Sequence, residues 1–188
     1  MSVPITKPTV GADNGTWGTE LNAALDALNA ADLFALRTAD RAALSATTTP
    51  VDDGVLAVTL GVGTYVIEAV YLVVHSTTGD FKVQWNFAGT ASSGFRSGIG
   101  PSLSTADVLG ATAQGVRLSG SGATAAALTS LVAYGCDTAT PANISMIIEK
   151  AVVVVTVGGI LKAQVCQNTA AGTTTVKAGS YIWARQVA

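Results

Sequence analysis

The stretch YVIEAVYLVVH, residues 65–75, decides the fold of this chain. Successive residues of an extended strand point to opposite sides of a sheet. One side of this stretch is apolar or aromatic from Tyr65 to Val73, and the other side is apolar except for Glu68. A strand that needs apolar cover on both sides lies in the middle of a layered structure. The stretch therefore predicts a central strand of a β-sandwich.

Strand patterns continue on both sides of this stretch. Residues 81–87 alternate apolar residues with Lys82, Gln84 and Asn86, which predicts a half-buried strand with one wet face. Further strands are expected at residues 55–60, 128–134, 144–157, 161–167 and 181–187. About eight strands separated by closely spaced turns predict a mainly β fold, a jelly roll or a similar sandwich.

Two segments between these strands read differently. Residues 89–118 are rich in Gly, Ser and Ala, and we expect loops with short strands there. Gly158-Gly159 is typical of a two-residue hairpin turn. Asp52-Asp53-Gly54 and Asp13-Asn14-Gly15 also have turn composition, and their few oxygens are more typical of turns than of a calcium site.

The first 45 residues form a separate part in this interpretation, an attachment arm ahead of a β-sandwich at residues 46–188. Pro4 and Pro8 favour extended backbone in the arm. Leu21, Leu25 and Leu28 then recur at helical spacing and form one apolar stripe on a short helix. Such a helix is marginal alone, so the stripe is expected to pack against other copies. Residues 32–44 are also compatible with a helix, and the pattern leaves open whether they continue the first helix or form a linker.

The composition of the 188 residues limits the classes of function. Charged residues make up 12% and hydrophobic residues 49%, with mean hydropathy +0.46 and net charge −2. The sequence contains no apolar run of about 18 residues, which is the length that a membrane-spanning helix needs. Without a basic tract, nucleic-acid binding is not expected, and no signal peptide is visible. An apolar chain of this kind predicts surface hidden between copies or against partners, although its many small residues also raise the hydropathy.

Few residues suggest chemistry. His75 is the single histidine and is expected to be exposed at a strand end. Glu68 and Glu149 lie in apolar strands, and we expect each to pair with Lys or Arg across a sheet or at a subunit interface. We therefore predict no catalytic residue, no metal and no cofactor.

Cysteine and aromatic residues leave alternatives open. Cys136 and Cys166 favour free thiols in a chain made in the cytoplasm, although a disulfide between neighbouring strands remains an alternative. The aromatic residues of the strands fit a core or an interface better than a carbohydrate platform. Trp17 stands at the helix entry, where we expect it to insert into a partner surface or into the base of a trimer.

The two ends of the chain resemble one family. Residues 9–22, TVGADNGTWGTELN, resemble the opening of many phage tail-fibre and minor tail proteins. Residues 164–169, QVCQNT, and 173–185, TTTVKAGSYIWAR, are similar to the closing strands of virion proteins from phages of actinobacteria. In those proteins the closing hairpin ends a trimeric domain that looks like the tumour-necrosis-factor (TNF) jelly roll. The resemblance covers about the first 28 and the last 30 residues, and unlike long tail fibres this chain has no shaft or repeats.

The resemblance implies a structural protein on the surface of a phage virion, a homotrimeric appendage of the minor tail or tail-fibre type. The alternative is a capsid decoration protein, either a cement or a head fibre. Its partners would be further copies, other tail or capsid proteins and, if it binds the host, a cell-surface glycan, without nucleic acid or membrane insertion. The residues expected for attachment or a helix bundle are Val10, Trp17, Leu21, Leu25 and Leu28. Those expected in the trimer core or interface are Tyr71, Val73, Ile148, Val153, Tyr181 and Trp183.

Overall fold

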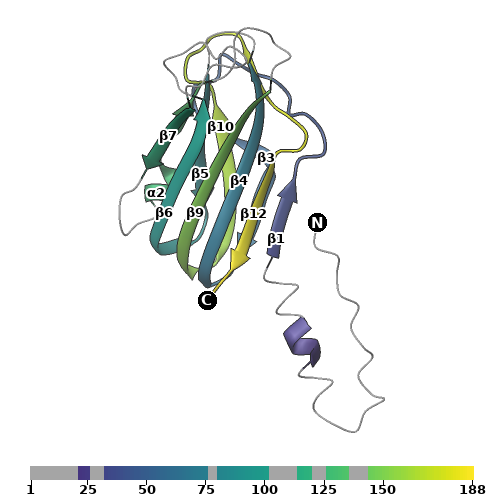
Figure 1. The fold of residues 1–188 in the computed structure, drawn as a ribbon, viewed down its shortest axis with the longest axis vertical. Helices are drawn as coiled ribbons and strands as arrows, with labels where there is room; N and C mark the ends of the chain where they lie inside the picture. The colour runs from purple at the N-terminus through teal and green to yellow at the C-terminus, as the bar shows by residue number, and fades with distance from the viewer. Residues whose placement is uncertain (1–20, 26–31, 76–79, 102–113, 120–125, 136–143) are drawn as a thin grey trace.

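The computed structural model describes residues 21–25, 32–75, 80–101, 114–119, 126–135 and 144–188. These residues form two antiparallel β-sheets that face each other, with the long strands running nearly side by side (Figure 1). A turn of helix at residues 21–25 precedes the strands. The mainly β, antiparallel sandwich expected from the sequence is confirmed.

The larger sheet has the strand order β1-β12-β4-β9-β6-β7, and β11 pairs with β4 and with β2. The smaller sheet has the order β3-β10-β5-β8. The strands of the larger sheet are β1 (Asp32–Leu36), β2 (Leu44–Ser45), β4 (Gly63–His75), β6 (Thr90–Pro101), β7 (Gln114–Ser119), β9 (Ser145–Val157), β11 (Thr173–Val176) and β12 (Tyr181–Gln186). The smaller sheet contains β3 (Val51–Leu60), β5 (Phe81–Phe87), β8 (Val132–Tyr134) and β10 (Gly159–Cys166), and a short helix, α2 (Ala126–Thr129), precedes β8.

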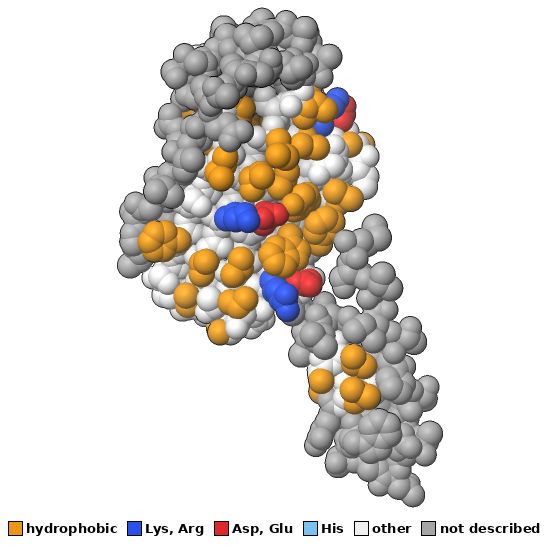
Figure 2. All heavy atoms as spheres, in the orientation of Figure 1, with side chains coloured by type: hydrophobic (Ala, Val, Ile, Leu, Met, Phe, Trp, Pro, Cys, Tyr) orange, Lys and Arg blue, Asp and Glu red, His pale blue; other side chains and the backbone are white. Residues whose placement is uncertain are grey.

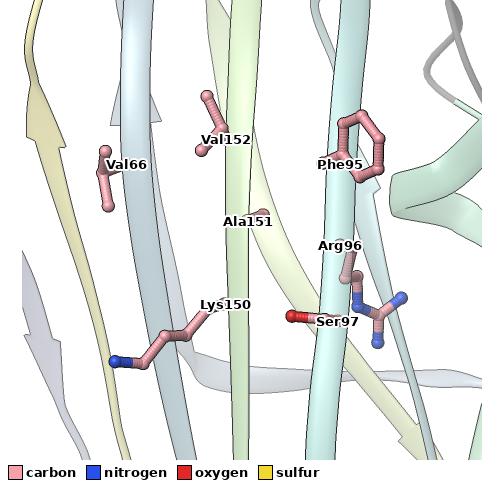
Figure 3. Close-up of a pocket in the computed structure, with 7 residues that line it drawn as sticks. All are labelled: Val66, Phe95, Arg96, Ser97, Lys150, Ala151 and Val152. Carbon is pink, nitrogen blue, oxygen red and sulfur yellow. The ribbon is translucent and has the colours of Figure 1, made fainter. Parts of the chain in front are cut away.

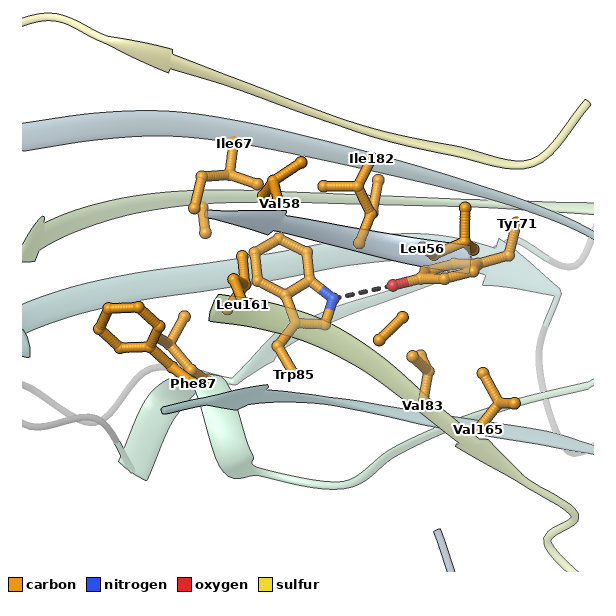
Figure 4. Packing of buried hydrophobic residues seen from close by; sticks show 14 of the residues in the cluster. Leu56, Val58, Ile67, Tyr71, Val83, Trp85, Phe87, Leu161, Val165 and Ile182 are labelled. Carbon is orange, nitrogen blue, oxygen red and sulfur yellow. Dashed lines mark hydrogen bonds between the residues drawn. The ribbon is translucent and has the colours of Figure 1, made fainter. Parts of the chain in front are cut away.

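Strand β4 has the central position predicted from its two apolar sides. It lies between β12 and β9, and its alternate residues from Tyr65 to Val73 are buried between the sheets. Trp85 from β5 meets them from the smaller sheet and is fully buried. Its indole N–H donates to the hydroxyl of Tyr71 at 2.9 Å (Figure 4). Fully burying one large apolar side chain stabilises a fold by about 1.5–3 kcal/mol, so this layer holds the sheets together.

The loops expected over residues 89–118 are wrong in part, because β6 is a twelve-residue strand. Its glycines serve close packing. A Cβ at Gly98 would lie 1.7 Å from the hydroxyl of Tyr134, and one at Gly100 would lie 2.7 Å from the same ring. Glycine inside a strand commonly marks such an approach of another group. The ring of Tyr134 from the smaller sheet therefore explains Gly98 and Gly100, two of the glycines that suggested loops.

The helix considered for residues 32–44 is also wrong. Residues Asp32–Leu36 form strand β1 at the edge of the larger sheet, paired antiparallel with β12 from Asp32↔Arg185 to Leu36↔Tyr181. The segment then crosses to the smaller sheet, where the guanidinium of Arg37 bonds the buried carboxylate of Asp53 at 2.8 Å. Pairing with β12 provides hydrogen bonds and burial that outweigh the helical propensity of Leu and Ala.

Three smaller expectations also differ from the structure. Gly158 does not close a hairpin, because β9 belongs to the larger sheet and β10 to the smaller one. At residues 128–134 the chain forms α2 and the three-residue β8 instead of one strand. The Asp52-Asp53-Gly54 turn lies within β3, where the register with β10 shifts. The carboxylate of Asp53 accepts the backbone N–H of Leu56 there at 3.1 Å, which stabilises the bulge.

Candidate functional site: the outer face of the larger sheet

The most unusual surface of the described structure is the side of the larger sheet that points away from the core. The strand registers align its outward side chains in rows across five strands, for example Phe95, Val152 and Val66, and in the next row Ser97, Lys150 and Glu68. We call this surface the outer face. Its residues are Asp32, Phe34, Leu36, Val66, Glu68, Val70, Leu72, Phe95, Ser97, Ile99, Met146, Ile148, Lys150, Val152, Tyr181, Trp183 and Arg185.

Many of these side chains are large, apolar and exposed. Phe95 is 71% exposed, Met146 56% and Ile99 48%. Figure 2 shows apolar side chains spread over β6, β9, β4 and β12, with charged side chains in a few isolated groups. A contiguous apolar surface of this kind on a soluble protein marks a contact site.

The smaller sheet has a different outer side. Gln84 donates to Gln164 at 2.7 Å, and Gln164 and Lys162 both bond the carboxylate of Asp52. A sheet with one side in water normally alternates apolar inner and polar outer residues. The smaller sheet follows this pattern and the larger one does not, which singles out the outer face as a surface that needs cover.

The charged residues of the outer face pair with one another. The ammonium of Lys150 lies 3.0 Å from Glu68, and the guanidinium of Arg185 lies 3.9 Å from Asp32. Glu68 also accepts the hydroxyl of Tyr181 at 2.6 Å. That hydrogen bond, with a smaller contribution from Lys150, lowers the pKa of Glu68, and the same bond raises the pKa of Tyr181 to about 12. The outer face is therefore electrically neutral.

A hollow of about 570 Å³ opens on the outer face between two rows of side chains. Val66, Val152 and Phe95 line one side, and Lys150 and Ser97 line the other (Figure 3). Arg96 and Ala151 also line it, and both are buried with side chains on the inner side of the sheet. The hollow is thus mostly apolar, with its floor at the sheet itself.

A polar cluster lies beneath this floor, inside the sandwich. The guanidinium of Arg96 bonds both carboxylate oxygens of Glu149, at 2.7 and 2.8 Å, and both side chains are fully buried. Arg96 also donates to the backbone carbonyls of Val83, Leu128 and Ser130, and it lies 5.0 Å from the centre of the Trp85 ring.

The hydroxyl of Tyr134 donates to Glu149 at 2.9 Å, which completes the cluster. Burial raises the pKa of Glu149, while Arg96 and Tyr134 act in the opposite direction. A buried ion pair with all its hydrogen bonds made fixes β6, β9 and the segment around α2 in one arrangement.

The predicted pairing of the two glutamates is confirmed. Glu149 pairs with Arg96, and Glu68 with Lys150. They lie on opposite sides of the sheet, because Glu68 faces Lys150 across β4 and β9 while Glu149 faces Ala69. They therefore cannot act together on one substrate as a carboxylate pair.

The six residues predicted for the trimer core or interface divide between two places. Tyr71, Val73 and Val153 are buried in the core of one copy. Ile148, Tyr181 and Trp183 are half-buried on the outer face. Successive side chains of each strand point alternately to the core and to the outer face, which explains this division.

Of the residues predicted for attachment, Val10, Trp17 and Leu28 lie outside the described residues. Leu21 and Leu25 belong to the helical turn at residues 21–25, where Leu21 is exposed and Leu25 is half-buried. The role predicted for them stays a prediction.

The remaining reactive side chains are buried. His75 is 1% exposed, so the expectation of an exposed strand end is wrong, and burial lowers its pKa. The reason is that β11 pairs beside the end of β4, with Thr174 opposite His75. Cys166 is a buried free thiol, and Cys136 lies outside the described residues. Within the described ranges no three His, Cys, Asp or Glu side chains group to hold a metal ion, and no helix is long and apolar enough to cross a membrane.

Several residues of the outer face were not identified from the sequence. Phe95 and Ile99 stand among glycines and serines that suggested loops, and Phe34 stands in a segment that suggested a helix. The signal that was present is their alternation with Gly94, Arg96 and Gly98, which has the period of a strand.

No protein-family profile matches the chain, and no curated protein matches it. Among solved structures, the chain is similar to Eiger TNF from S. frugiperda, with 13% identity and a TM-score of 0.41 over 84% of this chain and 92% of that one.

Proposed function

We propose that this chain is a structural, non-enzymatic protein of a bacteriophage virion that assembles as a homotrimer through the outer face. The carrying observation is the contrast between the two sheets, one with a polar outer side and the other with a neutral, apolar one. Contact between identical copies buries such a face without bringing net charges together. The protein then acts by burying its outer face between copies and by attaching to the particle.

The phage assignment rests on the resemblance of the two ends of the chain. In this proposal the residues before strand β1 attach the trimer to the particle, and the sandwich, which includes β1 and β2, forms the surface appendage. A tail position makes it a tail-fibre or minor tail protein, and a capsid position makes it a decoration protein.

The first test separates assembly from attachment. The full chain and a variant lacking residues 2–28 are compared by sedimentation equilibrium and by incorporation into particles. We expect both proteins to form trimers and only the full chain to be incorporated. A monomeric full chain at about 100 μM, well above typical affinities, contradicts the trimer. Incorporation of the shortened chain contradicts the role of the arm.

The second test finds the position on the particle. A cryo-electron reconstruction of intact particles is expected to show this chain on the surface. Many copies at three-fold positions of the head identify a decoration protein, and a few copies at the tail tip identify a tail component. Particles that lack the chain altogether contradict the proposal.

A further inference from the structure

Phe95 is a protruding aromatic side chain, and the hollow beside it is a pocket of the kind that binds such a side chain. Phe95 has the largest exposed fraction of the exposed large hydrophobic side chains that the structure describes. The hollow next to it is apolar on the side formed by Val66 and Val152, and it has room for an aromatic ring. Aromatic side chains that fill pockets are the commonest anchors of protein interfaces.

We propose that Phe95 of each copy inserts into the hollow of a neighbouring copy and anchors the assembly. This inference rests on the proposed self-association and names the contact that carries it. Ser97 is the residue that leaves the hollow open, because it stands opposite Lys150 where a larger side chain would fill the space.

The relative position of the ring and the hollow suits a closed assembly. The ring and the hollow are different patches of one face, so the ring of one copy can meet the hollow of the next. A contact between different patches closes into a ring when the rotation is cyclic, as in a trimer. The contact is thus compatible with the three copies of the proposed function.

The charges favour a second copy as the occupant. Lys150 pairs with Glu68 and Arg185 with Asp32 within one copy, so two such faces meet without net repulsion. Like charges brought together across an interface cost several kcal/mol, and a strongly charged partner finds no opposite net charge here.

The area of the outer face is also sufficient. Five strands about 4.8 Å apart, each contributing about six residues of about 3.4 Å, cover roughly 490 Å² when treated as flat. Stable interfaces bury about 800 Å² per partner, and the side chains of a sheet add to its flat area. The outer face therefore supplies most of one such contact.

The test compares matched substitutions in the full chain by sedimentation equilibrium. Phe95→Ala removes the ring, and Ser97→Leu fills the hollow. Ile160→Ala removes an exposed apolar side chain from the smaller sheet, and Thr59→Leu adds a leucine at an exposed position of β3, outside the outer face. Thermal unfolding of each variant checks its fold, with Phe95→Leu and Ser97→Met as replacements for a variant that folds poorly.

We expect Phe95→Ala and Ser97→Leu each to raise the dissociation constant at least about tenfold, as at an interface anchor, while both controls stay within about threefold. If both variants associate as tightly as the wild-type chain, the inference is overturned but self-association stands. Weakening by Phe95→Ala alone overturns the hollow as its site. A wild-type chain that stays monomeric overturns the inference together with the proposed trimer.

Discussion

Replacement of Arg96 by methionine tests the buried cluster that holds the two sheets together. Methionine has about the length of the arginine stem and carries no charge. The substitution leaves the carboxylate of Glu149 buried without its bidentate partner. It also removes the donors to the carbonyls of Val83, Leu128 and Ser130.

The magnitude follows from these contacts. Removing one partner of a buried ion pair costs about 3–5 kcal/mol, because the other charge stays uncompensated. Each buried carbonyl that loses its donor costs about 1–3 kcal/mol more. We expect Arg96→Met to lower the free energy of unfolding by about 5 kcal/mol or more, which is comparable to the total stability of many domains.

The assay is urea unfolding at fixed protein concentration, because association changes apparent stability. Adding Glu149→Leu to Arg96→Met removes the stranded charge while the carbonyls stay as they are, so we expect the double variant to recover at least about 2 kcal/mol. Lys162→Met breaks the exposed pair with Asp52 and serves as the control, with an expected loss under about 1 kcal/mol. The reasoning is refuted if Arg96→Met costs less than about 1.5 kcal/mol or if the double variant is no more stable than the single one.

Two further predictions concern backbone packing and pH. Gly98→Ala is expected to lower stability by about 1–3 kcal/mol in thermal or urea unfolding, because its Cβ meets the Tyr134 hydroxyl, and a variant as stable as wild type contradicts this packing. Glu68 has a lowered pKa, so its contribution is present above about pH 4.5 and lost as the pH falls through the lowered value. Glu68→Gln is therefore expected to be less stable than wild type by at most about 1 kcal/mol at pH 7 and equal to it near pH 2, and a difference that persists there contradicts the assignment. Tyr181 stabilises the fold below pH 10 and loses this contribution as the pH rises to about 12, which an absorbance titration against Tyr181→Phe measures.

The sequence predicted the fold wherever the strand pattern was strong. Strand β5 has the predicted limits, and β4 and β9 differ from them by only one or two residues, because long alternating apolar stretches have one favourable arrangement in a sandwich. Strand β6 was not predicted, since the glycines that admit the Tyr134 ring remove the apolar signal. Strand β1 was not predicted because its short sequence also fits a helix, and only the pairing with distant β12 decides between them.

The candidate site was predicted in part for a similar reason. The pairing of Glu68 and Glu149 with basic residues followed from the cost of an unpaired charge in an apolar strand. The identity of the partners required the registers, which place Lys150 opposite Glu68 and Arg96 beside Glu149. The outer face itself is built from five strands that lie far apart in sequence, so no local pattern contains it.

The place of β12 in the larger sheet has a consequence for how the protein is made. Strand β12 lies between β1 and β4, yet β4 ends at His75 and β12 begins only at Tyr181. During synthesis from the N-terminus, β4 therefore waits for β9 on one edge, and its other edge stays unpaired until more than a hundred residues have left the ribosome. An open edge accepts any suitable strand, including one from a neighbouring nascent chain. Expression level and chaperone supply should thus decide how much of this protein closes its own sheet before copies meet.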